Sequence, residues 1–125
     1  MSGAAAIMDF GQSGGGGGGG SLVATASGGG SASGQSPTNT FNLACVVTGG
    51  SGSYTYLWSR TSSFSGSWTT GGAAADFAAT VSGVPGGGGY GEAFYICTVT
   101  DTVSGKSVVS NTLTCFWLNT TGGFY

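Results

Sequence analysis

The residues whose chemistry could support catalysis are few in this 125-residue chain. Histidine is absent, and the four carboxylates, Asp9, Asp76, Glu92 and Asp101, are scattered along the sequence. General acid–base catalysis needs a base within reach of the group that it deprotonates, and a serine nucleophile needs such a base beside it. We therefore predict that the chain is not an enzyme and that it uses no cofactor.

The three cysteines are Cys45, Cys97 and Cys115, and they lack the close pairing and the histidine partners of zinc sites. An odd number of cysteines cannot pair completely within one chain. A disulfide would also not persist in a reducing cytosol. We expect three reduced thiols that pack as small apolar side chains, and no metal.

Two short motifs match functional patterns by composition. Gly86, Gly88 and Gly91 fit the GxGxxG pattern, but an apparent strand follows them, and a loop that binds phosphate needs a helix N-terminus after it. Asn119 begins the glycosylation sequon "NTT", yet the sequence has no recognisable secretory signal. We interpret both matches as accidental.

Charge argues against two classes of partner. Arg60 and Lys106 are the only cationic side chains, and the net charge is −2. Binding to nucleic acid or to anionic lipid depends on clustered cations. No apolar run approaches the roughly 20 residues of a membrane helix, and the apolar run 4–8 is too short for a signal peptide. We expect neither nucleic acid nor membrane as a partner, and synthesis in the cytoplasm without an export signal.

The sequence divides into four segments. Residues 1–10 contain the apolar side chains Ile7, Met8 and Phe10, and residues 11–20 are mostly glycine. A glycine-rich coil of this length spans about 16 to 19 Å and gains nothing from side-chain burial. We predict an anchor peptide (1–10), a tether (11–20), a folded domain (21–119) and a short tail (120–125). A frayed terminus without function is the alternative for residues 1–20.

Alternation of apolar and polar residues predicts strands separated by turns rich in glycine and serine. No apolar stripe at helical spacing is present. Six segments carry the alternation: residues 22–26, 40–48, 54–59, 76–82, 92–100 and 107–117. Short strands at this spacing indicate an all-β fold, an antiparallel β-sandwich. In residues 92–100, either Tyr95, Cys97 and Val99 or Phe94 and Ile96 face inward.

Aromatic residues in the predicted turns offer the main binding hypothesis. Trp68 and Tyr90 lie between predicted strands, where exposed rings could stack on sugars. The alternative is that Trp68 packs locally over a sheet edge. Trp58 is expected in the core.

Four residues resemble those of an immunoglobulin-like domain. Cys45, Trp58 and the pair Tyr95 and Cys97 resemble its strand B cysteine, strand C tryptophan and tyrosine corner. The stretches "VVTGGSGSYTYLWS" and "YICTVTDTVSGKSVVSNTLTC" are similar to bacterial and phage Ig-like and polycystic-kidney-disease-type domains. The resemblance covers residues 36–118 and implies an Ig-like sandwich with these four side chains in its core and Tyr95, Cys97 and Val99 facing inward.

The resemblance also implies a function without catalysis. It suggests a structural protein of a bacteriophage virion, displayed in many copies on the exterior of the capsid as a decoration or head-fibre protein. Ile7, Met8 and Phe10 would anchor it to a capsid protein. The alternative is a tail-fibre or tail-tip module that binds host-surface glycans through Trp68 and Tyr90, and a third possibility is a bacterial surface adhesin.

Overall fold

The computed structural model describes residues 20–122, which form ten strands and no helix. The strands are β1 (Val23–Ser27), β2 (Gly30–Gly34), β3 (Asn39–Thr48), β4 (Tyr54–Phe64), β5 (Ser67–Trp68), β6 (Gly71–Gly72), β7 (Asp76–Ser82), β8 (Gly89–Asp101), β9 (Ser107–Val109) and β10 (Leu113–Asn119).

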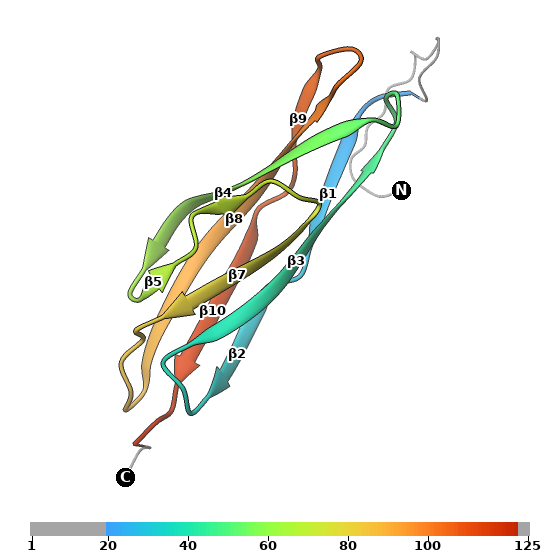
Figure 1. Cartoon of the computed structure of the whole chain (residues 1–125). Coiled ribbons are helices and arrows are strands. Elements are labelled where there is room, and N and C mark those ends of the chain that lie inside the picture. The colour runs from blue at the N-terminus through green and yellow to red at the C-terminus, as the bar shows by residue number, and fades with distance from the viewer. Residues whose placement is uncertain (1–19, 123–125) are drawn as a thin grey trace.

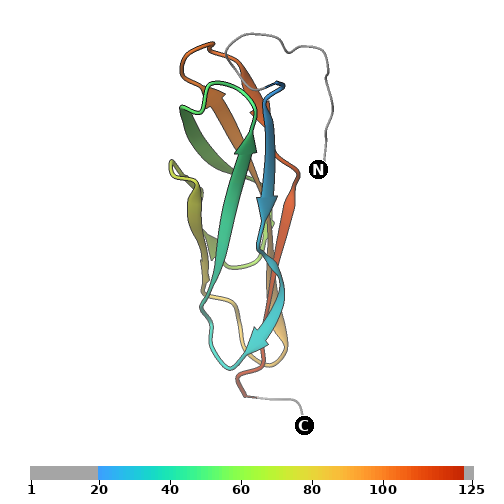
Figure 2. The ribbon, with the colours of Figure 1, turned by 90° about the vertical axis from the view of Figure 1, so that its right-hand side faces the viewer.

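The strands form two sheets that pack face to face (Figure 2). One sheet has the order β1-β3-β7-β5, and the other has the order β2-β10-β8-β4-β6, with β9 paired to β8. The pairings are antiparallel apart from β2 with β10, which is parallel. The predicted all-β sandwich is confirmed.

The chain changes sheets between β1 and β2, at a run of glycines whose composition predicts a break between strands. Gly28 and Gly29 have positive φ angles of 103° and 81°. A Cβ atom on Gly28 would collide with the Asn42 carbonyl, and one on Gly29 would lie 2.7 Å from the Thr114 carbonyl. Glycine is needed here because the backbone passes so close to both sheets.

Several predicted strands are extended or interrupted. β4 continues past residue 59 to Phe64 through a register shift between Arg60 and Ser62. The segment 107–117 is divided into β9 and β10 at Ser110, whose N–H still donates to the Cys97 carbonyl but whose hydroxyl, at 2.9 Å, accepts the hydrogen bond from the Cys97 N–H. β7 has the predicted bounds 76–82.

The core lies between the sheets and is built from the inward positions of the alternating strands. On β8, Tyr95, Cys97 and Val99 are fully buried, which decides between the two faces that the pattern allowed. Trp58 of β4 stacks on Phe77 of β7, with ring centroids 5.8 Å apart. Full burial of one such side chain contributes about 1.5 to 3 kcal/mol.

Residues 20 and 122, the first and last described residues, lie at opposite ends of an elongated sandwich (Figure 1). We call the end near residue 20 the entry end and the end near residue 122 the exit end. At the entry end, the Gly20 carbonyl accepts a hydrogen bond from Gly50, and Thr102 donates to Ser53. At the exit end, Thr120 donates to the Gly34 carbonyl, and the Thr121 carbonyl accepts from Gly87. β8 spans the distance between the ends with 13 residues, roughly 40 Å of extended chain.

Candidate functional site

The titratable groups of residues 20–122 are dispersed rather than gathered into a reactive site. No three potential metal ligands come together in this part of the chain. No helix here is long and apolar enough to cross a membrane. The candidates for a functional site are therefore individual buried groups and the surfaces of the sheets.

Asp101 is the best-partnered carboxylate, and its partners are structural. It is 2% exposed and accepts hydrogen bonds from the Ser51 N–H (2.6 Å), the Ser51 hydroxyl (2.8 Å) and the N–H groups of Val103 and Ser104. These donors, those of Ser51 foremost, lower the pKa of Asp101 to about 2. Through these hydrogen bonds the carboxylate connects the hairpin 101–106 to the loop 49–53.

The thiols are buried in the core and suited to packing. Burial raises the pKa of Cys45 to about 12 and that of Cys115 to about 11, and it also raises the pKa of Cys97. All three are unpaired cysteines, and the neighbouring Cys97 thiol adds to the rise in the pKa of Cys45. The thiolate is the nucleophilic form of cysteine, so these side chains are poor nucleophiles at neutral pH.

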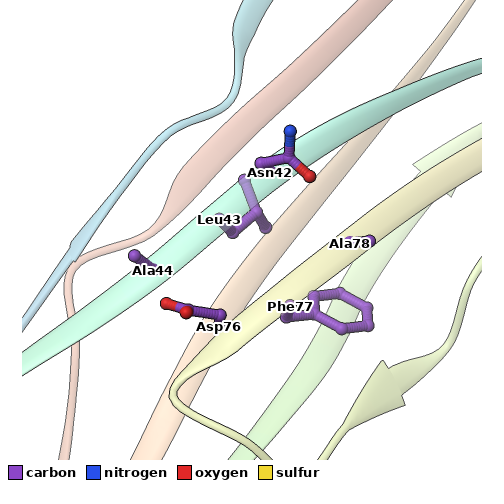
Figure 3. Close-up of a pocket in the computed structure, with 6 residues that line it drawn as sticks. All are labelled: Asn42, Leu43, Ala44, Asp76, Phe77 and Ala78. Atoms are coloured by element: carbon purple, nitrogen blue, oxygen red, sulfur yellow. The ribbon is translucent and has the colours of Figure 1, made fainter.

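The outer face of the four-stranded sheet has an open depression of about 390 Å³ between β3 and β7 (Figure 3). Its lining is Asn42, Leu43, Ala44, Asp76, Phe77 and Ala78. Asp76 is its single ionisable group, so the depression has no partner for acid–base chemistry.

The prediction that Trp68 projects from a loop is wrong. Trp68 belongs to β5, pairs with Val81 of β7 and is 5% exposed. Its ring stacks on Phe41 at 6.0 Å, and its indole N–H donates to the Ser65 carbonyl at 2.9 Å. Strand pairing turns the ring inward, so Trp68 cannot present a face to a sugar.

Tyr90, the other predicted binding residue, is 42% exposed and lies on the outer face of the six-stranded sheet. Its ring is 5.1 Å from that of Phe116 on β10 and 5.4 Å from that of Phe64 on β4. We call these three residues the aromatic row. Phe64 is 58% exposed and Phe116 is half-buried, so the row forms a continuous apolar surface next to solvent.

Glu92 lies within this surface. It is the cross-strand partner of Phe64 on one side and of Phe116 on the other, and it follows Tyr90 by two residues, on the same face of β8. Hydroxyl side chains border the row on the neighbouring strands: Ser31, Ser33, Ser62 and Thr114, all exposed.

The sequence analysis named Tyr90 as an exposed aromatic residue but placed it between strands, whereas it belongs to β8, and it did not name the two neighbouring rings. Phe64 was not predicted to lie on a strand, because the predicted strand ended at residue 59, before the bulge beyond which β4 stays paired to β8. Phe116 lay in a predicted strand, but its position opposite Glu92 depends on a register that a single strand does not encode. The proposed anchor residues Ile7, Met8 and Phe10 lie outside the described residues.

The other four predicted residues occupy the core. Cys45, Trp58, Tyr95 and Cys97 are each at most 6% exposed, and the Tyr95 hydroxyl donates to the Thr69 carbonyl at 2.6 Å.

A comparison with family models gave no match, and neither curated proteins nor solved structures gave one. Function must therefore be inferred from the geometry of the chain itself.

Proposed function

We propose that this protein is a non-enzymatic component of a bacteriophage virion, an Ig-like domain displayed on the capsid exterior and attached through its N-terminal segment. The observation that carries the proposal is that the N-terminal segment joins the sandwich at one of its two ends. Residue 20, where residues 1–19 join the domain, lies at one end, and the opposite end is roughly 40 Å away. A domain held in this way projects its far end outward.

The chemistry of the domain supports display over catalysis. The described thiols are buried, Asp101 accepts hydrogen bonds from Ser51 and from nearby N–H groups, and the other carboxylate side chains of residues 20–122, Asp76 and Glu92, lie on the outer faces of different sheets. A surface rich in serine and threonine and poor in charge suits a module that makes only weak electrostatic contacts with its surroundings.

The anchor assigned to residues 1–10 supplies the attachment. Burial of Ile7, Met8 and Phe10 against a capsid protein would contribute about 1.5 to 3 kcal/mol for each side chain. The glycine-rich residues 11–20 give the domain a reach of about 16 to 19 Å from that contact. Many copies on one particle would strengthen any weak contact of the domains with a host surface.

Deletion of residues 1–10 tests the attachment. The truncated protein should be lost from purified particles, measured by mass spectrometry of virion proteins, and should keep its folded β-sheet spectrum. The matched control is deletion of residues 15–18, which shortens the tether and leaves the anchor intact; it should keep occupancy near that of the full chain. Occupancy of the 1–10 deletion equal to the full chain would refute the anchor.

Imaging of particles with and without the protein tests its location. Extra density at capsid lattice points is the expected result. Density confined to the tail would instead support the alternative, a tail-fibre or tail-tip receptor-binding module, and the aromatic row is the observation that keeps this alternative open.

A further inference from the structure

We propose that the aromatic row of Phe64, Tyr90 and Phe116, with Glu92 between its strands, is a binding site for a neutral carbohydrate. The site lies on the outer face of the six-stranded sheet and replaces the one expected at Trp68, which is buried. Its use in host recognition rests on the proposed display on a virion, but binding itself does not.

Exposure is the first argument for a ligand at this position. Contiguous exposed apolar patches on soluble proteins often mark binding sites. Phe64 and Tyr90 are 58% and 42% exposed, although each packs against another ring of the row. Phe64 contacts Tyr90 alone among the described rings, and more than half of its side chain is exposed to solvent.

The mixture of groups matches the chemistry of a sugar. One face of a sugar ring presents weakly positive C–H groups, which pack on the electron-rich face of an aromatic ring. The rim of the sugar carries hydroxyl groups, which are good donors to a carboxylate. Glu92 supplies that acceptor between Phe64 and Phe116, and the hydroxyls of Ser31, Ser62 and Thr114 surround the rings on the same face.

The negative charge of Glu92 restricts the expected ligands to neutral sugars. An anionic glycan, a phosphate or a nucleic acid would face the Glu92 carboxylate, and no cationic side chain of residues 20–122 is a cross-strand partner of the row. Of the two cationic side chains, Arg60 donates through Nη1 to the Trp68 carbonyl, and Lys106 lies in the hairpin at the entry end. A second copy of the chain is also disfavoured, because symmetric pairing over the row would bring two Glu92 carboxylates together.

The position of the site agrees with outward presentation. Tyr90 is the second residue of β8, and the first, Gly89, is paired with Asn119 at the exit end. The chain joins residues 1–19 at the other end of β8, beside Asp101. A domain tethered at residue 20 therefore carries the row on its far half, where a surface glycan can reach it (Figure 1).

The binding experiment uses the purified full chain on an array of immobilised oligosaccharides. The array contains neutral chains of hexose, deoxyhexose and N-acetylhexosamine, together with sialylated and sulfated chains. We expect retention on a subset of the neutral chains. The affinity of the free oligosaccharide should be weak, and NMR titration should shift the backbone amides of residues 62–64, 90–92 and 114–118.

Two variants and a matched control locate the site. Phe64→Ala and Tyr90→Ala should each weaken binding by roughly tenfold, the order expected for loss of one aromatic contact. Leu57→Ala is the control, because Leu57 is 56% exposed on the same strand and lies outside the row. It should bind as the unmodified chain does. Since these side chains are exposed, all three variants should keep their folded structure.

Four outcomes would overturn the proposal. They are retention of no neutral glycan, retention of anionic chains alone, NMR shifts that map elsewhere, and unchanged binding in both aromatic variants. Self-association in sedimentation that Phe64→Ala abolishes, without glycan binding, would assign the row to a second copy instead. Glycan binding by a protein that is absent from particles would refute the display proposal and leave this site standing.

Discussion

The Asp101 carboxylate accepts hydrogen bonds from both the backbone N–H and the hydroxyl of Ser51, at 2.6 and 2.8 Å. The two residues belong to different connections, the loop 49–53 and the hairpin that follows β8, so one side chain closes the entry end of the sandwich. This is also the end at which the chain arrives at residue 20, since Gly50 donates to the Gly20 carbonyl. A buried negative charge that accepts several hydrogen bonds therefore organises the entry end.

The first prediction concerns the pH dependence that Asp101 imposes. Its pKa falls from 3.8 to about 2 on folding, so its contribution to the free energy of unfolding is complete above pH 3.8 and is lost as the pH falls toward 2. Asp101→Asn should be less stable at pH 6 and should lose less stability between pH 4 and pH 2. Urea denaturation at a series of pH values measures both.

The control for this prediction is Asp76→Asn, which removes an exposed carboxylate. Because this side chain is exposed, the substitution should leave the stability at pH 6 close to that of the unmodified protein. Equal slopes for the unmodified chain and Asp101→Asn between pH 4 and pH 2 would contradict the role given to the Ser51 hydrogen bonds.

The sequence predicted the sandwich well because each long strand carries its own alternation. Residues 76–82 place Phe77, Ala79 and Val81 on one face, and the structure buries all three. The short strands were not predicted, because each is held by pairing with a strand that is distant in the sequence. β2 is a run of glycine, serine and alanine whose ladder depends on β10, and β5 has two residues held by β7.

The candidate site was less predictable than the fold for the same reason. Trp68 and Tyr90 were both expected between strands, yet both belong to paired strands, and the Trp68 ring faces inward whereas the Tyr90 ring faces outward. The grouping of Phe64, Glu92 and Phe116 requires the registers of three strands at once. A bulge after Arg60 sets one of those registers, and nothing local in the sequence marks it.

The second prediction concerns the chain crossing between the sheets. Gly28→Ala should lower the free energy of unfolding by about 2 to 4 kcal/mol, since it adds a steric collision with the Asn42 carbonyl to the cost of a positive φ angle. Gly52→Ala is the matched control: Gly52 has a similar φ of 95°, but no atom lies within 4 Å of the place that an added methyl group would take. It should cost about 1 kcal/mol. Equal losses in denaturation would show that the crossing is not sterically tight.

The third prediction concerns the Tyr95 hydroxyl. Tyr95 is fully buried and its hydroxyl donates to the Thr69 carbonyl at 2.6 Å, which ties the connection after β5 to β8. Tyr95→Phe keeps the ring and its contact with Phe77 but removes the donor. The free energy of unfolding should fall by about 1 kcal/mol.

The comparison for Tyr95→Phe is Tyr90→Phe, which removes a hydroxyl from a half-exposed ring. Thermal denaturation of this control should match the unmodified chain within about 0.5 kcal/mol. A Tyr95→Phe protein as stable as the control would mean that the Thr69 hydrogen bond contributes nothing net to folding.

The fourth prediction concerns thiol reactivity. Burial keeps Cys45, Cys97 and Cys115 protonated, with the pKa of Cys45 raised to about 12 and that of Cys115 to about 11. At pH 8 a maleimide should therefore label none of them in the folded protein and all three in denaturant, which intact-mass spectrometry counts directly. Val103→Cys provides the reference, because residue 103 is 75% exposed and its thiol should react at once. Labelling of a native cysteine as fast as the reference would contradict the stable burial of these thiols, since it would require frequent opening of the core.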